Sequence, residues 1–227
     1  VLFIDAATFV AGFVIVALLV HSPGIPVDGH EDHEHAFRAV YRFLRGDPLL
    51  RPWSAVLILG DVMWLALFAA LPVLVLDRFG DEPAYVGLSF AGFGFGAIVG
   101  GVIAFRVIGT VDRILLASVG EIGMALPLWL LLVHASPWLL VGAFAVAGFA
   151  NGLVNPALHT IVQLRTPRHL LTKLYSTVIT ATAVLGPVVL ICTGPALDRF
   201  GVDPTVAVIV ALDTLLVLLF AAAGLRF

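Results

Sequence analysis

Cysteine and charge are both scarce in this sequence. Cys192 is the only cysteine, which excludes a disulfide framework and a thiolate metal site within one chain. Charged residues make up 12% of the 227 residues, against roughly 25% in an ordinary soluble domain. The net charge is -3 and no basic stripe is present, so we expect no nucleic-acid partner.

Hydrophobic residues, by contrast, make up 61% of the chain. A helix that crosses a bilayer needs about 20 mainly apolar residues and must satisfy its backbone hydrogen bonds internally. Seven segments meet this requirement, at residues 1–20, 54–76, 85–108, 113–133, 137–164, 173–195 and 204–225. We therefore predict an all-α integral membrane protein with seven transmembrane helices and no soluble domain between them.

The first span differs from the others in what surrounds it. The chain begins inside an apolar run without Met or a basic leader, so we expect it to be part of a larger protein. Residues 21–53 then separate this span from the rest, whereas the other connections have about four to ten residues. The segment holds an acidic, His-rich run, "HEDHEH", where we expect no metal, since nothing in a short solvated linker orients the ligands.

The end of this linker is periodic. Phe37, Val40, Tyr41 and Leu44 recur at helical spacing, and arginines occupy another face. This pattern predicts an amphipathic helix that lies on the membrane surface.

Basic residues predict the orientation of the spans, because cytoplasmic loops hold an excess of Lys and Arg. If the spans alternate, one side receives only Arg78 and Arg199. The other side receives ten residues: Arg38, Arg42, Arg45, Arg51, Arg106, Arg113, Arg165, Arg168, Lys173 and Arg226. We expect the linker and the C-terminus to face the cytoplasm.

Four stretches give the chain a family resemblance: "LFIDAATFVAGFVIVALL", "FRAVYRFLRGDPLLRP", "LPVLVLDRFGDEPAYVGLSFAGFGFGAIVGG" and "NGLVNPALHTIVQLRTPRHLLTKLYS". Their order resembles a major facilitator superfamily transporter from its sixth helix onward, closest to macrolide-efflux and siderophore exporters. The resemblance implies that residues 1–20 are the last helix of a truncated N-terminal half and residues 21–53 a cytoplasmic interdomain linker. Residues 54–227 would be the six-helix C-terminal half, built as a 3+3 inverted repeat.

One family motif is altered. The superfamily's cytoplasmic loop signature corresponds to "GGVIAFRVIGTVDR", where Phe105 stands at the position of an Asp while Arg106 and Gly109 remain. A gating salt bridge at this loop is therefore in doubt.

Four acidic residues lie in or near spans: Asp5, Asp61, Glu121 and Asp213. An ionised carboxylate at bilayer depth costs about 2.5 to 3.5 kcal/mol on insertion scales, so each is a candidate functional residue. The resemblance places Asp61 on a helix that lines the central cavity, where it would contact protons or substrate. Glu121 and Asp213 would lie on peripheral helices, with contacts between helices as their simpler role.

The 137–164 span carries a polar stripe. Asn151, Asn155, His159 and Gln163 recur at steps of four and share one sector of the helix, together with Gly148 and Gly152. This stripe is either a pathway for substrate or water, or a set of hydrogen bonds between helices. The hydroxyls of the 173–195 span, Tyr175 among them, carry less weight, because they often bond their own backbone.

Two further patterns indicate architecture. Gly92, Gly96 and Gly100 form a small-residue stripe that allows two helices to approach closely. The pentapeptide LDRFG occurs at 76–80 and at 197–201, each time at the end of an apolar run. We predict that both copies end helices on the outer face, with Gly suited to the cap.

The function that the resemblance implies is transport. We expect no enzyme and no cofactor, but part of an exporter of small amphipathic compounds in the cell membrane, by proton-coupled antiport. Its partners would be the substrate, the bilayer and the missing N-terminal half, without which the piece transports nothing. The alternatives are a seven-helix receptor or a structural membrane fragment. A retinal protein is excluded, because Lys173, the only lysine, lies at a helix start.

Overall fold

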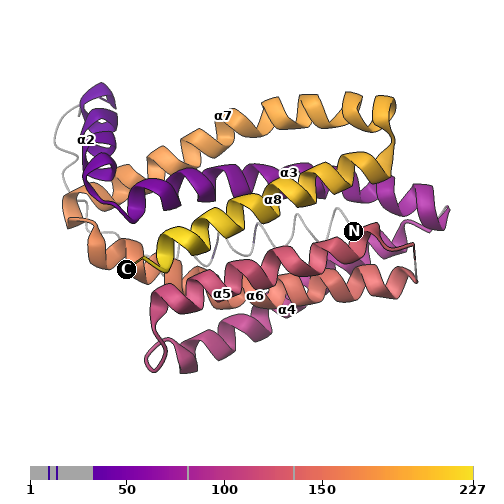
Figure 1. The fold of residues 1–227 in the computed structure, drawn as a ribbon, viewed down its shortest axis with the longest axis horizontal. Helices are drawn as coiled ribbons and strands as arrows, with labels where there is room; N and C mark the ends of the chain where they lie inside the picture. The colour runs from indigo at the N-terminus through magenta and orange to yellow at the C-terminus, as the bar shows by residue number, and fades with distance from the viewer. Residues whose placement is uncertain (1–9, 11–13, 15–32, 81, 135, 227) are drawn as a thin grey trace. The chain divides into compact units, whose positions relative to one another are not determined.

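The computed structural model describes residues 10, 14, 33–80, 82–134 and 136–226 (Figure 1). These residues form helices and no strands: α2 (His33–Gly46), α3 (Leu50–Phe79), α4 (Ala84–Val107), α5 (Arg113–Ala125), the 3₁₀ helix η1 (Leu126–Leu132), α6 (Pro137–Arg165), α7 (Arg168–Phe200) and α8 (Val202–Gly224). Six stretches are long and apolar enough to cross a membrane, with α5 and η1 counted together. The predicted all-α membrane fold is confirmed. The predicted first span, Asp5 and residues 30–32 of the His-rich run lie outside the described residues.

Two helices are longer than the sequence predicted. α3 begins at Leu50, inside the predicted linker, because Asp47 Oδ1 accepts hydrogen bonds from the backbone N–H groups of Leu49 and Leu50, both at 2.9 Å. α7 continues through Pro195 to Phe200. Proline does not end such a helix where neighbouring groups satisfy the freed backbone.

The third predicted span is not one continuous α-helix. α5 ends at Ala125 and the chain continues as η1, which has Pro127 in its first turn. Proline lacks the backbone N–H that the next α-helical hydrogen bond requires, so the last turns tighten into a 3₁₀ helix.

The helix contacts support the predicted repeat of two triplets, α3–α5 and α6–α8. α4 packs against α6, and α7 packs correspondingly against α3. α5 packs against α6, α8 packs against α3, and α5 also contacts α8. Exchanging the two triplets leaves this set of contacts unchanged, and successive helices run antiparallel (Figure 1). Both are features of a 3+3 inverted repeat.

Small residues hold α4 and α6 together, as the glycine stripe predicted. A Cβ added at Gly96 or Gly100 would overlap the backbone of α6 at Ala145 or Phe149. A Cβ at Gly148 or Gly152 would likewise overlap the α4 backbone. These two α6 glycines therefore serve the contact with α4, although helical arithmetic puts them in the sector of the polar stripe.

The LDRFG segments end helices as predicted. α3 ends at Phe79 and α7 at Phe200, and the following Gly80 and Gly201 have φ values of 71° and 87°. Only glycine adopts this region without strain. Both ends lie on the same side of the bundle, opposite to the end of α6 at Arg165 (Figure 1).

Helix α2 confirms the predicted helix before the first described span. Val40 is buried, whereas Phe37 and Tyr41 are exposed. One part of the apolar stripe, at Val40, packs against the protein, and the other part, at Phe37 and Tyr41, remains uncovered. Such an uncovered aromatic face suits the membrane interface.

Candidate functional site

Two cavities meet inside the bundle, and Asp61 and Asn155 line both of them. The first, which we name the acid cavity, has a volume of about 70 Å³ and lies among α3, α5, α6 and α8. The second, the apolar cavity, has a volume of about 300 Å³ and lies mainly among α3, α6 and α7. Leu57 and Leu158 also line both, so the two spaces share one wall.

The acid cavity collects three acidic residues that the sequence singled out. Asp61 comes from α3, Glu121 from α5 and Asp213 from α8, and the Glu121 carboxyl lies within electrostatic range of the other two. No Lys or Arg is among the residues that line this cavity. The three acids therefore face one another without a basic side chain.

Their exposure differs. Asp213 is only 3% exposed, and its Oδ2 atom has no hydrogen-bond partner in the described part of the chain. Glu121 is half-buried and Asp61 is exposed. Asp61 is thus the member of the group that reaches the uncovered face of the bundle.

Asn151 and Asn155 bring the polar stripe of α6 into the acid cavity. Asn155 Nδ2 donates to Asn151 Oδ1 at 2.9 Å and to the Asn151 carbonyl at 3.2 Å. Asn151 Nδ2 in turn lies 3.7 Å from the sulfur of Met124 on α5. The two amides therefore form a chain of contacts along α6 that begins at Met124 of α5.

His159 continues the stripe in the apolar cavity. Its Nδ1 lies 3.0 Å from the hydroxyl of Tyr175 on α7, and both side chains line this cavity. Gln163 is a further hydrogen-bond partner of Tyr175 but lines neither cavity. The structure thus brings together four of the five predicted pathway residues, and connects Gln163 only through Tyr175.

Two further residues line the apolar cavity: Tyr175, which carries little weight in the sequence pattern, and Trp53, which no sequence pattern singles out. Trp53 stacks on Phe220 of α8, with ring centroids 4.2 Å apart, and its indole N–H donates to the Phe220 carbonyl at 3.0 Å. Phe220 lines the acid cavity. The two residues are 167 positions apart in the sequence, so no local pattern predicts their contact.

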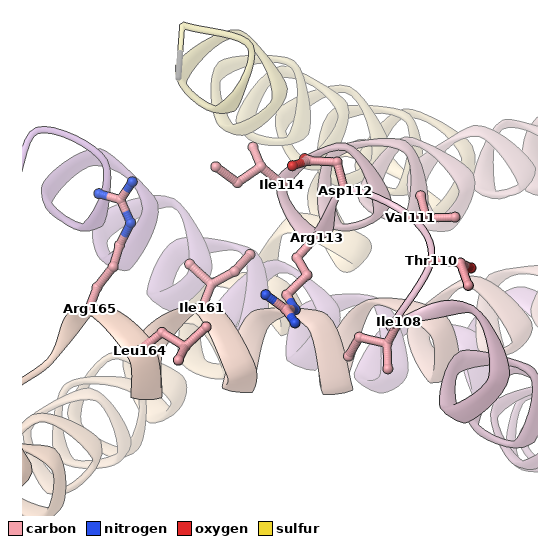
Figure 2. A pocket seen from close by; sticks show the side chains of 10 residues that line it. Ile108, Thr110, Val111, Asp112, Arg113, Ile114, Ile161, Leu164 and Arg165 are labelled. Carbon is pink, nitrogen blue, oxygen red and sulfur yellow. The ribbon is translucent and has the colours of Figure 1, made fainter.

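A third pocket, of about 340 Å³, lies at the end of the bundle that is rich in Arg (Figure 2). Arg113 reaches from the start of α5 toward the last turns of α6, and Arg165 lies apart from it. Arg165 contacts Asp47 at 3.4 Å, and Asp112 caps α5 by accepting from the Leu115 N–H at 2.8 Å. Phe105, which the resemblance places at the family's Asp position, is 81% exposed, and its ring carries no carboxylate.

Comparison with known proteins identifies the family. Residues 1–190 of the 227 match the family model described as Major Facilitator Superfamily. No curated protein matches the chain, and no solved structure matches it. Members of this family are membrane transporters that act on small molecules, which argues against the receptor alternative. With most of its length matched and its six long apolar helices in two triplets, the chain belongs to the Major Facilitator Superfamily.

Proposed function

We propose that the complete protein exports small amphipathic compounds by exchanging them for protons, as the resemblance to macrolide and siderophore exporters implies. The observation that carries this proposal is the junction of the two cavities at Asp61 and Asn155. One cavity offers apolar surface for a substrate, and the other gathers carboxyls that can take up protons. Because Asp61 lines both cavities, its carboxyl can bind a proton in one and contact the substrate in the other.

The apolar cavity suits an amphipathic substrate. Its volume of about 300 Å³ is in the range of small-molecule sites, which are mostly apolar with a few polar groups. Here the polar groups are Ser54 and Asp61 from α3, Asn155 and His159 from α6, and Tyr175 from α7. A compound with an apolar body and a basic amine would pack on the leucines and pair its amine with Asp61.

The polar groups also lie on a face that other parts of the protein must cover in the bilayer. Asp61, Asn155, His159 and Gln163 are exposed. Polar side chains in a membrane face the bundle interior or water and not lipid. We propose that the N-terminal half of the transporter covers this face, and that the two halves rock against each other around the cavity.

The protein would lie in the cell membrane with its Arg-rich end in the cytoplasm. Of the described residues, Arg51, Arg113, Arg165 and Arg168 lie at one end of their helices, and Arg78 and Arg199 at the other. This asymmetry supports the orientation with α2 and the end of α8 inside.

Efflux measurements test the coupling. The complete chain is expressed in cells without other exporters, and loss of ethidium and erythromycin is followed with and without a proton gradient. Wild-type protein should export both, and a protonophore should stop the export. Asp61→Asn should abolish the export that depends on the proton gradient. Asp77→Asn, which changes an exposed carboxyl at the end of α3, should leave this export intact.

Two outcomes would contradict the proposal. If Asp61→Asn exports both compounds with the gradient as well as the wild type does, Asp61 does not couple export to protons. If the wild type exports neither compound, the proposed class of amphipathic substrates is wrong. Separately, vesicles that contain only residues 1–227 should show no ethidium flux. Flux in these vesicles would disprove the need for an N-terminal half.

A further inference from the structure

We propose that Glu121 and Asp213 share one proton inside the acid cavity and exchange it with Asp61. This inference rests on the proposed proton coupling and adds to it where the proton is held. Asp61 alone reaches the uncovered face, so the proposed exchange with substrate needs no other carboxyl. The two acids behind it have no task in that scheme, although they lie in the same cavity.

The inverted repeat explains why these two side chains line one cavity. α5 and α8 occupy equivalent places in the two triplets, and they pack against each other. Glu121 and Asp213 each lie within the apolar part of their helix, and both line the acid cavity. The pair therefore lies where the two triplets join, and it is held by helix packing and not by a loop.

Asp213 has a buried oxygen without a partner. The residue is only 3% exposed, and its Oδ2 has no hydrogen-bond partner among the described residues. A buried carboxylate oxygen without a donor is costly, and a second carboxylate in the same cavity adds repulsion. One proton shared by Glu121 and Asp213 through cavity water removes one negative charge and supplies an O–H donor.

The surroundings offer no basic side chain. The carboxyl and amide groups that line the cavity are Asp61 on α3, Glu121 on α5, Asp213 on α8, and Asn151 and Asn155 on α6, and the indole of Trp64 lines it as well. His159 lines the neighbouring cavity, and no Lys or Arg of the described chain lines either one. The amides of Asn151 and Asn155 are engaged with each other and with Met124.

A proton fits this place better than a metal ion. Within the described ranges, no group of three or more His, Cys, Asp or Glu residues is arranged to hold a metal. The cavity volume of about 70 Å³ is enough for water molecules, because a cavity holds one water molecule from about 10 to 15 Å³ upward. Water can therefore connect carboxyls that do not touch.

The proton moves between the Glu121–Asp213 pair and Asp61 and needs no other reactant. When Asp61 is ionised, the shared proton moves through cavity water to the Asp61 carboxylate. Asp61 becomes neutral, and the Glu121–Asp213 pair then carries two negative charges until it takes up another proton. The pair is thus a store behind Asp61, and the substrate never contacts it.

Infrared spectroscopy of the complete chain in lipid nanodiscs tests whether the proton is shared. The wild type should show a carbonyl band of a protonated carboxyl that disappears as pH rises. Glu121→Gln and Asp213→Asn should each remove the same band, whereas the exposed-site variant Asp77→Asn should retain it. Absence of the band from the wild type, or a separate band for each acid, would overturn the shared proton.

Transport in proteoliposomes tests whether the store matters. Ethidium transport driven by a proton gradient should fall about 5- to 150-fold in Glu121→Gln and in Asp213→Asn, the usual range for coupled sites. Exchange of ethidium without a gradient should continue in both variants, and Glu121→Asp should restore gradient-driven transport in part. Gradient-driven transport that is unchanged, or that falls together with exchange, would overturn the role in coupling.

The two failures are distinguishable. If wild-type transport ignores the proton gradient, the proposed function fails, and with it the exchange with Asp61, while the infrared band still decides whether the pair holds a proton. If a variant does not fold, native protein is treated with dicyclohexylcarbodiimide, which reacts with protonated carboxyls. Mass spectrometry should then find label on Glu121 or Asp213 that decreases as pH rises, and label that does not change with pH would contradict the proposal.

Discussion

Arg78 forms an ion pair with Asp203, so that the first LDRFG segment contacts the chain just beyond the second one. The Arg78 side chain is only 6% exposed, and it also donates to the carbonyl of Leu131 at the end of η1. His134 Nε2 lies 2.9 Å from the other oxygen of Asp203. One arginine therefore joins the end of α3, the end of η1 and the start of α8.

The second copy of the pentapeptide has no such role. Arg199 is exposed, and its guanidinium lies over the ring of the neighbouring Phe200 at 5.6 Å. The same five letters thus end two helices in the same way, but only one of the two arginines lies against other elements. The helix end that both copies form depends on local sequence, whereas the contacts of Arg78 depend on the tertiary structure.

Replacing Arg78 tests this difference. Arg78→Ala removes the donor of the Leu131 carbonyl and leaves Asp203 with His134 alone, and we expect a loss of about 1 to 3 kcal/mol in the free energy of unfolding. Arg199→Ala is the matched control and should change it by less than about 0.5 kcal/mol. Denaturant unfolding of the complete chain in detergent measures both. Equal effects of the two variants would show that the Arg78 contacts contribute nothing.

The glycine contact of α4 and α6 makes a second prediction. Gly100→Ala places a methyl group into the backbone of α6 at Phe149, and such overpacking costs about 1 to 3 kcal/mol. Gly94→Ala is the control on the same helix, because a Cβ there meets nothing within 4 Å. We expect a lower melting temperature for Gly100→Ala and an unchanged or higher one for Gly94→Ala. The reverse order would disprove the close approach.

The bond between His159 and Tyr175 makes a third prediction, on activity. Tyr175→Phe keeps the ring but removes the hydroxyl that lies 3.0 Å from His159 Nδ1. A net hydrogen bond of about 1 kcal/mol corresponds to a loss of roughly fivefold in ethidium export at low substrate concentration. Tyr41→Phe, on the exposed face of α2, is the control. Export by Tyr175→Phe at the wild-type rate would remove this bond from the transport pathway.

Orientation in the membrane makes a fourth prediction. Starting from a Cys192→Ser background, a cysteine introduced in place of Asp77 should react with an impermeant maleimide added to intact cells. A cysteine in place of Arg168 should react only after the cells are opened, because the two positions lie at opposite ends of the bundle. Both positions are exposed, so access depends on the side of the membrane alone. The opposite labelling pattern would invert the proposed topology.

Much of the fold was predictable because it depends on local free energies. All six predicted spans that lie within the described residues correspond to helices, since a backbone in lipid must bond internally, and both LDRFG segments end helices at a glycine with positive φ. The glycine stripe of α4 was predictable for a similar reason, since only small residues allow close contact. The tightening of α5 into η1 at Pro127 was missed, because hydropathy does not register which kind of helix carries an apolar run.

By itself, then, the sequence determined the spans, their ends, their charge asymmetry and the polar residues they carry. The tertiary structure decided which of these residues share a space. It placed Asp61, Glu121 and Asp213 in one cavity and left Gln163 outside it. It also joined Arg78 to Asp203 across 125 residues. The physical reason is that which residues share a space depends on how helices far apart in the sequence pack. Here α3, α5 and α8 pack against one another or against α6, and each brings one acid to the cavity.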